Sequence, residues 1–157
     1  MDRRTLLKAA ASLPLVRIGA AMAADLPPLA AAARDAWIFA LPLIEMAQTR
    51  ARMAALPANR LFHKRVLATP KDVSVTTPNN DTLYSSAWLN LANGPVRLTI
   101  PPSGDRYLSV ALMDMYTNNF AVLGTRTIGR DGGSFTILGP GAASDDPLAV
   151  RATTPWV

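Results

Sequence analysis

Residues 83–100, LYSSAWLNLANGPVRLTI, contain two runs of alternating side chains separated by Asn93-Gly94-Pro95. Alternation with a period of two places successive side chains on opposite faces of a strand, and an Asn-Gly-Pro tripeptide favours a tight turn. The stretch therefore predicts two strands joined by a turn, at residues 83–91 and at residues 96–100.

Strand-like patterns of alternation also occur before and after this pair. They lie at residues 73–77, 107–115, 120–127 and 134–138. The glycine-rich segment 129–133 lies between the last two patterns and predicts a hairpin turn that joins them. Residues 142–151 are typical of a surface loop, and residues 153–157 resemble the start of a further strand, where Trp156 either docks on the core or awaits additional polypeptide.

Before these strands, residues 29–56 are rich in alanine, leucine, methionine and arginine and contain no glycine, which predicts helix. Residues 36–47 are apolar on nearly every side, as in a buried helix. Pro42 predicts either a kink or two helices that meet there. The expected fold class is α+β, with an N-terminal helical segment packed on a mostly antiparallel β-sheet, sandwich or partial barrel.

The composition excludes several classes of protein. Half of the 157 residues are hydrophobic, 17% are charged and the mean hydropathy is +0.16. A disordered chain would have low hydrophobicity and a high net charge. The absence of cysteine excludes disulfides and thiolate metal sites, and a single histidine excludes a zinc site with several imidazole ligands within one chain.

The N-terminus has the three zones of an export signal: the pair Arg3-Arg4, a short apolar stretch, and small residues before Asp25. The pair resembles a twin-arginine motif, and the apolar stretch is too short to span a membrane. Cleavage between Ala23 and Ala24 would leave residues 24–157 as a single periplasmic domain. The alternative is an amphipathic helix that stays attached.

The export signal also affects the charge of the working protein. Three of the five net positive charges belong to residues 1–23, so the remaining chain is only slightly basic. Nucleic-acid binding depends on the neutralisation of many phosphates, and we do not expect it here. We expect no stable membrane span either.

Three segments closely resemble the domain-of-unknown-function 1254 family: WIFALPLIEM at 37–46, PNNDTLYSSAW at 78–88, and DMYTNNF at 114–120 followed by Gly124-Thr125-Arg126. The resemblance covers about residues 30–141. It implies a bacterial protein, often exported or membrane-tethered, and commonly followed by a domain of the 1214 family. That second domain is absent from this sequence, which suggests either a shortened reading frame or a partner chain that supplies it.

Two polar turns are candidates for chemistry. The first is Asn79-Asn80-Asp81-Thr82, and the second contains Asp114, Tyr116, Asn118 and Asn119. Their carboxylate and amide oxygens suit a hard cation such as Ca²⁺ or Mg²⁺, whereas Asn and Asp also serve turns by bonding to their own backbone. If both turns lie at one edge of the sheet, they line one pocket.

Glu45, the only glutamate, lies in the most apolar part of the helix. Together with Asp81 and Asp114 it is a candidate catalytic residue, and the alternative is a structural ion pair with Arg50, Arg60 or Arg126. His63 is interpreted as an ordinary surface or hydrogen-bonded side chain. Ser85 and Ser86 lack the Gly-x-Ser-x-Gly elbow of a nucleophilic serine.

Aromatic and amide side chains suggest a binding site for a small molecule or glycan. The candidate ligand-binding residues are Asn79, Asn80, Tyr84, Trp88, Tyr116, Asn118, Asn119 and Arg126, although the aromatic ones, with Tyr107, also suit a core. Three functions remain open: a binding module or the N-terminal part of a larger envelope protein, a hydrolase-like enzyme with a carboxylate site, and an assembly subunit completed by a separate chain.

Overall fold

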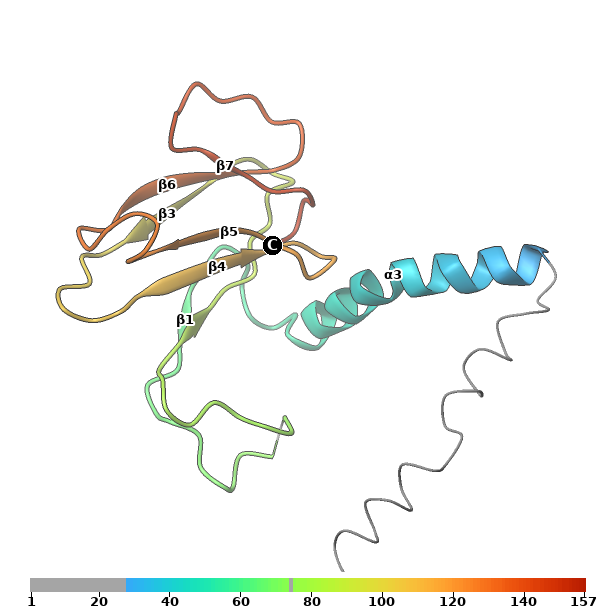
Figure 1. The fold of residues 1–157 in the computed structure, drawn as a ribbon, viewed down its shortest axis with the longest axis horizontal. Helices are drawn as coiled ribbons and strands as arrows, with labels where there is room; N and C mark the ends of the chain where they lie inside the picture. Colours follow the sequence, from blue (N-terminus) through green and yellow to red (C-terminus); the bar gives the residue numbers. More distant parts are fainter. Residues whose placement is uncertain (1–27, 74) are drawn as a thin grey trace, which may run out of the picture. The chain divides into compact units, whose positions relative to one another are not determined.

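The computed structural model describes residues 28–73 and 75–157, which form one helix and seven short strands (Figure 1). The chain divides into two compact units, Met1–Leu41 and Pro42–Val157. The predicted export signal and its cleavage site lie outside the described residues. The α+β class is confirmed, and the sheets do not close into a barrel.

Helix α3 runs from Pro28 to Arg52 and continues through Pro42, so of the two alternatives predicted at Pro42 the division into two helices is wrong. Pro28 suits the first turn of the helix, because the N–H group that proline lacks would have no partner there. Arg50 and Arg52 in the last turn interact favourably with the negative end of the helix dipole. No residue of α3 is buried, which contradicts the predicted buried helix. The apolar side chains on nearly every side of residues 36–47 would permit burial of this helix, but burial also requires other segments of the protein to pack against each side of it.

The last turn of α3 is fixed within the second unit by two contacts. The guanidinium of Arg50 lies 4.9 Å from the centre of the Trp156 ring. The indole N–H of Trp88 donates to the Met53 sulfur, which follows the helix, at 3.5 Å. Trp156 is only half-buried, and its ring lies against the Arg50 guanidinium at the helix end, whereas one of the two sequence interpretations placed it on the core.

Seven strands form three small sheets. The strands are β1 (Phe62–His63), β2 (Ser85–Ser86), β3 (Val96–Ile100), β4 (Ser109–Met113), β5 (Asn119–Gly124), β6 (Gly133–Leu138) and β7 (Val150–Arg151). The sheets have the orders β1-β2, β3-β6-β7 and β4-β5, and every pair is antiparallel except β6-β7. The two larger sheets contribute to one core.

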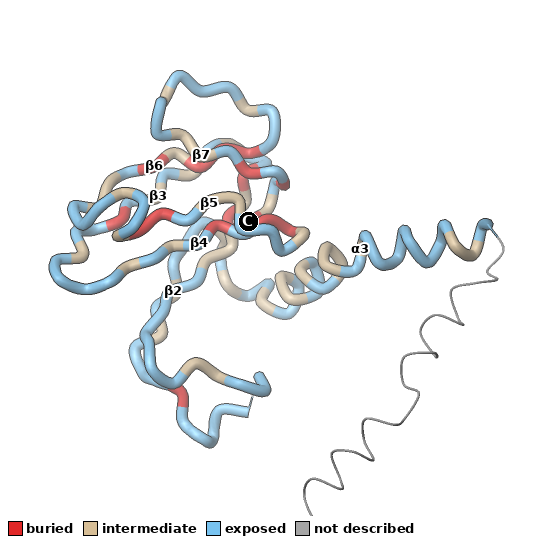
Figure 2. Tube along the Cα trace, viewed as in Figure 1, coloured by how far each residue is buried: buried red, intermediate tan, exposed pale blue. Residues whose placement is uncertain are grey.

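The buried residues of the core lie mainly along the β3-β6 and β4-β5 pairs and in the segments that flank them (Figure 2). Ile137 at its centre is completely buried. The other buried members are Leu89, Leu91, Ile100, Leu112, Leu123, Phe135, Ala152 and Val157. Val96, Leu98 and Val110 of β3 and β4 are among the partly buried residues that pack against this core.

The predicted hairpin around residues 129–133 is wrong. β5 pairs with β4 and β6 pairs with β3, so residues 125–132 carry the chain from one sheet to the other. The chain turns away directly after β5, because Thr127 accepts a hydrogen bond from the Gly124 N–H at 2.9 Å and donates to the Val122 carbonyl at 2.8 Å. Gly132 then passes so close to the backbone of Ile100 that it leaves no space for a side chain.

The predicted strand at 83–91 is reduced to β2, and residues 73 and 75–77 are irregular. Leu89 and Leu91 instead donate backbone hydrogen bonds to the carbonyls of Val157 and Pro155, each at 2.8 Å. The C-terminal residues therefore do pair with another segment, as their strand-like sequence suggested. β7 lies inside the predicted loop at 142–151, and Val150 finds its partner in Ile137 of β6.

Candidate functional site

A groove between β3 and β4, with a volume of about 530 Å³, is lined by both apolar and polar side chains. Within the second unit it is lined by Met46, Met53, Asn59, Arg60, Leu61, Ser85, Ser86, Ala87, Trp88, Leu89, residues 96–99, residues 110–113 and Val157. It lies on the side of the core where Val96, Leu98 and Val110 remain partly exposed. The groove is thus an accessible face of the hydrophobic core.

The lining is basic as well as apolar. It contains Arg60 and Arg97 and no aspartate or glutamate. Arg97 stands opposite Thr136 in the β3-β6 ladder. The pKa of Asp146 is lowered mainly by the hydrogen bond that the Thr136 hydroxyl donates to it at 2.7 Å, with a smaller effect of the Arg97 charge. Arg97 is thus partly compensated within the domain, whereas Arg60 is exposed and forms no salt bridge within the described residues.

His63 and Ser85 form a close pair beside this groove. They are directly opposed in the β1-β2 ladder, and Nδ1 of His63 lies 2.7 Å from Oγ of Ser85. Ser85 also lines the groove. No sequence pattern predicts this pair, because its two residues are 22 positions apart and only the register of two very short strands brings them together.

Asp114 is one of the few buried polar residues, with 3% of its surface exposed. Its carboxylate accepts hydrogen bonds from the backbone N–H groups of Tyr116 and Asn118, from the Asn118 side-chain amide, and from the Thr153 hydroxyl. Burial raises the pKa of Asp114, but the hydrogen bonds of Thr153, Asn118 and Tyr116 together hold that pKa below its usual value. Its observed contacts close the turn at residues 114–118 and anchor it to Thr153.

The other polar turn is also organised by its own backbone. The Asn79 side-chain oxygen accepts from the N–H groups of Asp81 and Thr82, and its amide donates to the Thr82 carbonyl and hydroxyl. Asn80 and Asp81 are exposed. This is the local bonding by which asparagine stabilises turns.

The structure does not bring the two polar turns together. Asp81 belongs to the segment between β1 and β2, which extends away from the larger sheets (Figure 1), whereas Asp114 follows β4 and accepts a hydrogen bond from Thr153 near the C-terminus. Among the described residues no group of three or more histidine, aspartate or glutamate side chains is placed to hold a metal ion. A shared carboxylate or cation site at these turns therefore has no support from the geometry.

Glu45 does not have the environment predicted for it. It is exposed on α3, and the only salt bridges in the described part of the chain are Arg34–Asp35 and Arg130–Asp105. The predicted buried carboxylate and its arginine pair are both wrong, because the helix face that carries Glu45 is not covered.

The candidate ligand-binding aromatics are dispersed. Trp88 lines the groove, whereas Tyr84 is exposed under Lys64, with the Lys64 nitrogen 5.8 Å from its ring centre. Arg126 lies over Tyr107, another exposed ring, at 5.5 Å. Tyr116 is half-buried in the Asp114 turn, and Asn119 is exposed at the start of β5. Of the predicted ligand-binding residues, only Trp88 lines the β3-β4 groove.

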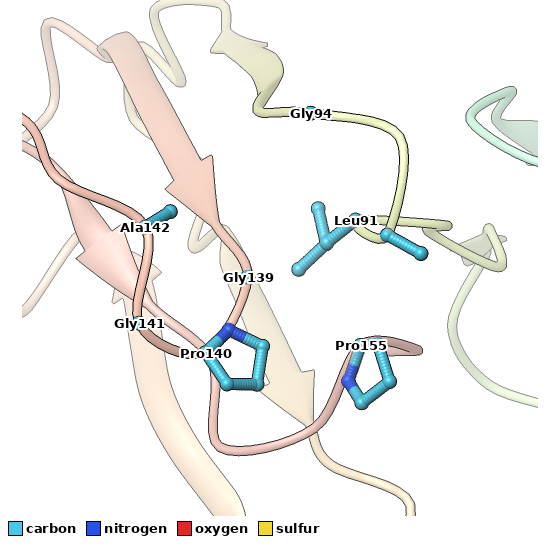
Figure 3. A pocket seen from close by; sticks show the side chains of 8 residues that line it. Leu91, Gly94, Gly139, Pro140, Gly141, Ala142 and Pro155 are labelled. Atoms are coloured by element: carbon cyan, nitrogen blue, oxygen red, sulfur yellow. The ribbon is translucent and has the colours of Figure 1, made fainter.

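A second hollow, of about 590 Å³, lies between Leu91, Pro155 and the loop after β6 (Figure 3). Its lining consists of Leu91, Ala92, Gly94, Gly139, Pro140, Gly141, Ala142 and Pro155. These residues carry no titratable side chain, so this hollow offers little chemistry by which to select a ligand.

A family model described as "Protein of unknown function (DUF1254)" matches residues 58–157. The chain belongs to the DUF1254 family. The match contains the whole β-rich part of the chain, including β3, β4 and most of the groove lining. The resemblance inferred from the sequence is therefore confirmed for this domain.

The DUF1254 domain is also similar to a solved structure, the VPA0106 protein from Vibrio parahaemolyticus, with a TM-score of 0.57 and 24% identity. The similarity covers 74% of this chain and 28% of that chain, so this chain spans less than a third of the length of the solved protein. No curated protein matches the sequence. At this identity the similarity establishes the fold alone.

Proposed function

We propose that this DUF1254 domain is a binding module that holds an elongated, largely apolar ligand with an acidic group in the β3-β4 groove. The observation that carries the proposal is the combination of an exposed part of the hydrophobic core with a lining that contains two arginines and no carboxylate. Apolar clefts with a few polar groups that fix orientation are the usual form of binding sites.

The apolar contribution comes from the side of the core that the domain leaves open. Val96, Leu98 and Val110 are only partly buried, although they pack against fully buried residues. Burial of apolar surface stabilises a complex by about 25 cal/mol for each Å² removed from water. A ligand that covers these side chains therefore gains affinity without any rearrangement of the core.

The polar contribution comes from the rim. Arg60 is exposed and adjoins Asn59, which also lines the groove. Ser85, Ser86 and Thr99 add hydroxyl groups to the lining. A carboxylate on the ligand is favoured at such a rim because arginine binds carboxylates through paired, charge-assisted hydrogen bonds.

The test uses an anionic apolar dye, anilinonaphthalene sulfonate, and a matched pair of variants. Leu61 lines the groove and is 43% exposed, whereas Leu148 is 57% exposed and lies outside it. We expect Leu61→Glu to weaken dye binding at least about tenfold, through lost apolar contact and charge repulsion, and Leu148→Glu to leave it unchanged. Equal binding by both variants, or no binding by the native protein, would overturn the proposal.

We further propose that the domain is exported and works as one part of a larger envelope protein. Support comes from the signal-like N-terminal sequence and from the small share of the Vibrio protein that the chain spans. Within residues 28–73 and 75–157 no helix has the length and apolarity needed to cross a bilayer. Expression of the full chain with Arg3→Lys and Arg4→Lys should block its appearance in the periplasm; unchanged export would contradict the twin-arginine route.

A further inference from the structure

The edge of β3 beside the groove indicates what kind of ligand the site takes. We infer that the ligand is an extended segment of another polypeptide, which adds as a strand to β3. This inference rests on the proposed binding function of the groove and specifies the class of ligand. It depends on three features: the unpaired edge of β3, the alternation of its side chains, and the charge of the groove.

The first feature is the edge itself. β3 pairs with β6 along one side and, within the described residues, with no strand along the other. In an antiparallel ladder alternate residues direct both their N–H and C=O groups away from the partner, so an edge strand offers a row of unused donors and acceptors. Residues 96–99 line the groove, and this row therefore borders the proposed site.

β3 is better suited to strand addition than β4 on the opposite side of the groove. The β3-β6 register is regular over all five residue pairs. The β4-β5 register shifts between Leu112 and Met113, and such irregularities disturb the edge of a sheet and oppose further pairing. Pro95 and Pro101 flank β3 and limit the pairing to about the length of the strand itself.

The second feature is the alternation of side chains along β3. Val96, Leu98 and Ile100 face the core, whereas Arg97 and Thr99 are exposed. A strand added beside β3 has the same alternation, because side chains of neighbouring strands share their faces. The segment that fits best therefore has an apolar residue at every second position, which continues the open side of the core.

The third feature is charge, which favours a partner over a second copy of this chain. The groove lining contains Arg60 and Arg97 and no carboxylate, so it favours a segment that carries aspartate or glutamate. A second β3 strand, VRLTI, carries an arginine and no acid. Recognition by strand addition, with main-chain bonds for affinity and side chains for selection, is a known mode of peptide binding.

The experiment uses the full chain and a synthetic peptide of about seven residues that alternates valine with threonine and has one central glutamate. Two further peptides have the same side chains but carry N-methyl groups on alternate residues, one on the odd positions and one on the even, so that each blocks one edge. Titration calorimetry measures affinity, and hydrogen exchange measures protection of the backbone amides.

We expect the parent peptide to bind and to protect alternate amides of residues 96–100, and one methylated peptide to bind at least about tenfold more weakly than the other. Equal binding by all three peptides, or protection along β5 instead of β3, would overturn strand addition. Self-association measured by sedimentation, with β3 protected in the absence of peptide, would assign the edge to a second copy and also overturn the inference.

The same titration separates this inference from the proposed function. Dye binding that depends on Leu61, together with no peptide binding, would leave a binding groove but exclude a polypeptide as its ligand. If neither the dye nor the peptide binds, both proposals fail. As a charge control, Arg60→Glu should weaken binding of the peptide, whereas Arg106→Glu, at an exposed position outside the groove lining, should leave it unchanged.

Discussion

The hydroxyl of Thr153 donates a hydrogen bond of 2.6 Å to Oδ2 of Asp114, across 39 positions of the sequence. The neighbouring Thr154 accepts a bond from the Met115 N–H at 3.1 Å. The turn after β4 is thereby tied to the segment that follows β7. Asp114 is a structural anchor between two distant parts of the chain.

We predict that Asp114→Ala lowers the free energy of unfolding by about 2–3 kcal/mol, because it removes the buried, charged acceptor of four hydrogen bonds. Urea denaturation monitored by tryptophan fluorescence measures the change. Thr153→Val removes only one of the four hydrogen bonds and should cost about 1 kcal/mol.

Because Asp114 and Thr153 share a bond, their effects should not add in the double variant. Additive losses would show that the 2.6 Å contact contributes nothing to stability.

The lowered pKa of Asp114 predicts how stability depends on pH. A carboxyl group whose pKa is lower in the folded state stabilises the fold when it is ionised, so its contribution is complete above the ordinary aspartate pKa of about 3.9 and is lost as the pH falls through the folded value. Thermal unfolding of the native protein should therefore show stability falling below about pH 4. The stability of the Asp114→Asn variant should fall less steeply in this pH range.

The comparison with Asp114→Asn is necessary because two other aspartates, Asp72 and Asp146, also have lowered pKa values. Hydrogen bonds from the backbone and hydroxyl of Thr69 lower the pKa of Asp72, and the Thr136 hydroxyl lowers that of Asp146. Both are present in the native protein and in the variant. Identical pH profiles would mean that Asp114 does not contribute.

Two residues with left-handed backbone predict opposite effects of the same substitution. Thr117 has φ of 68° and Asn59 has φ of 61°. A β-branched residue is strained there, so Thr117→Gly should raise the free energy of unfolding by about 0.5–1 kcal/mol. Asparagine tolerates this backbone conformation at position 59. The Asn59 side chain also accepts a hydrogen bond from the Asn90 N–H at 2.7 Å and donates one to the Asn90 carbonyl at 3.3 Å, so Asn59→Gly should lower the free energy of unfolding.

Thr117→Ala is the control for the first substitution, since alanine keeps the Cβ that causes the strain. If Thr117→Ala stabilises as much as Thr117→Gly, backbone conformation is not the reason. Chemical denaturation of the three variants under one set of conditions decides this.

Local patterns predicted the parts of the fold that depend on local physics. β3 was predicted at its observed bounds because its alternation of apolar and polar residues matches one buried and one exposed face. Hydrogen bonds between the Asn79 side chain and the backbone of its own turn were one of the two interpretations of that turn, and such bonds are observed. In both cases the deciding interactions lie within a few residues.

Pairing between distant segments was predicted less well. The glycines at 129–133 indicate a turn but do not specify which strands it joins, and β6 pairs with β3 across more than thirty positions of sequence. Glu45 was expected to be buried because apolar neighbours surround it in sequence, yet burial depends on what packs against each face. The groove and the His63–Ser85 pair likewise follow from strand register, which no spacing in the sequence shows.

Gly124, the last residue of β5, is required for close approach and not for backbone conformation. It is buried opposite Ser109, and a Cβ at this position would overlap the Leu108 carbonyl oxygen and the Ser109 Cα. Gly124→Ala therefore forces the β4-β5 strands apart and should cost about 2–3 kcal/mol. Gly141→Ala, where φ is 72° but no atom lies within 4 Å, should cost only about 1 kcal/mol from backbone strain. Equal losses in thermal denaturation would show that the β4-β5 pair accommodates a methyl group, and that the contact with Leu108 does not fix its register.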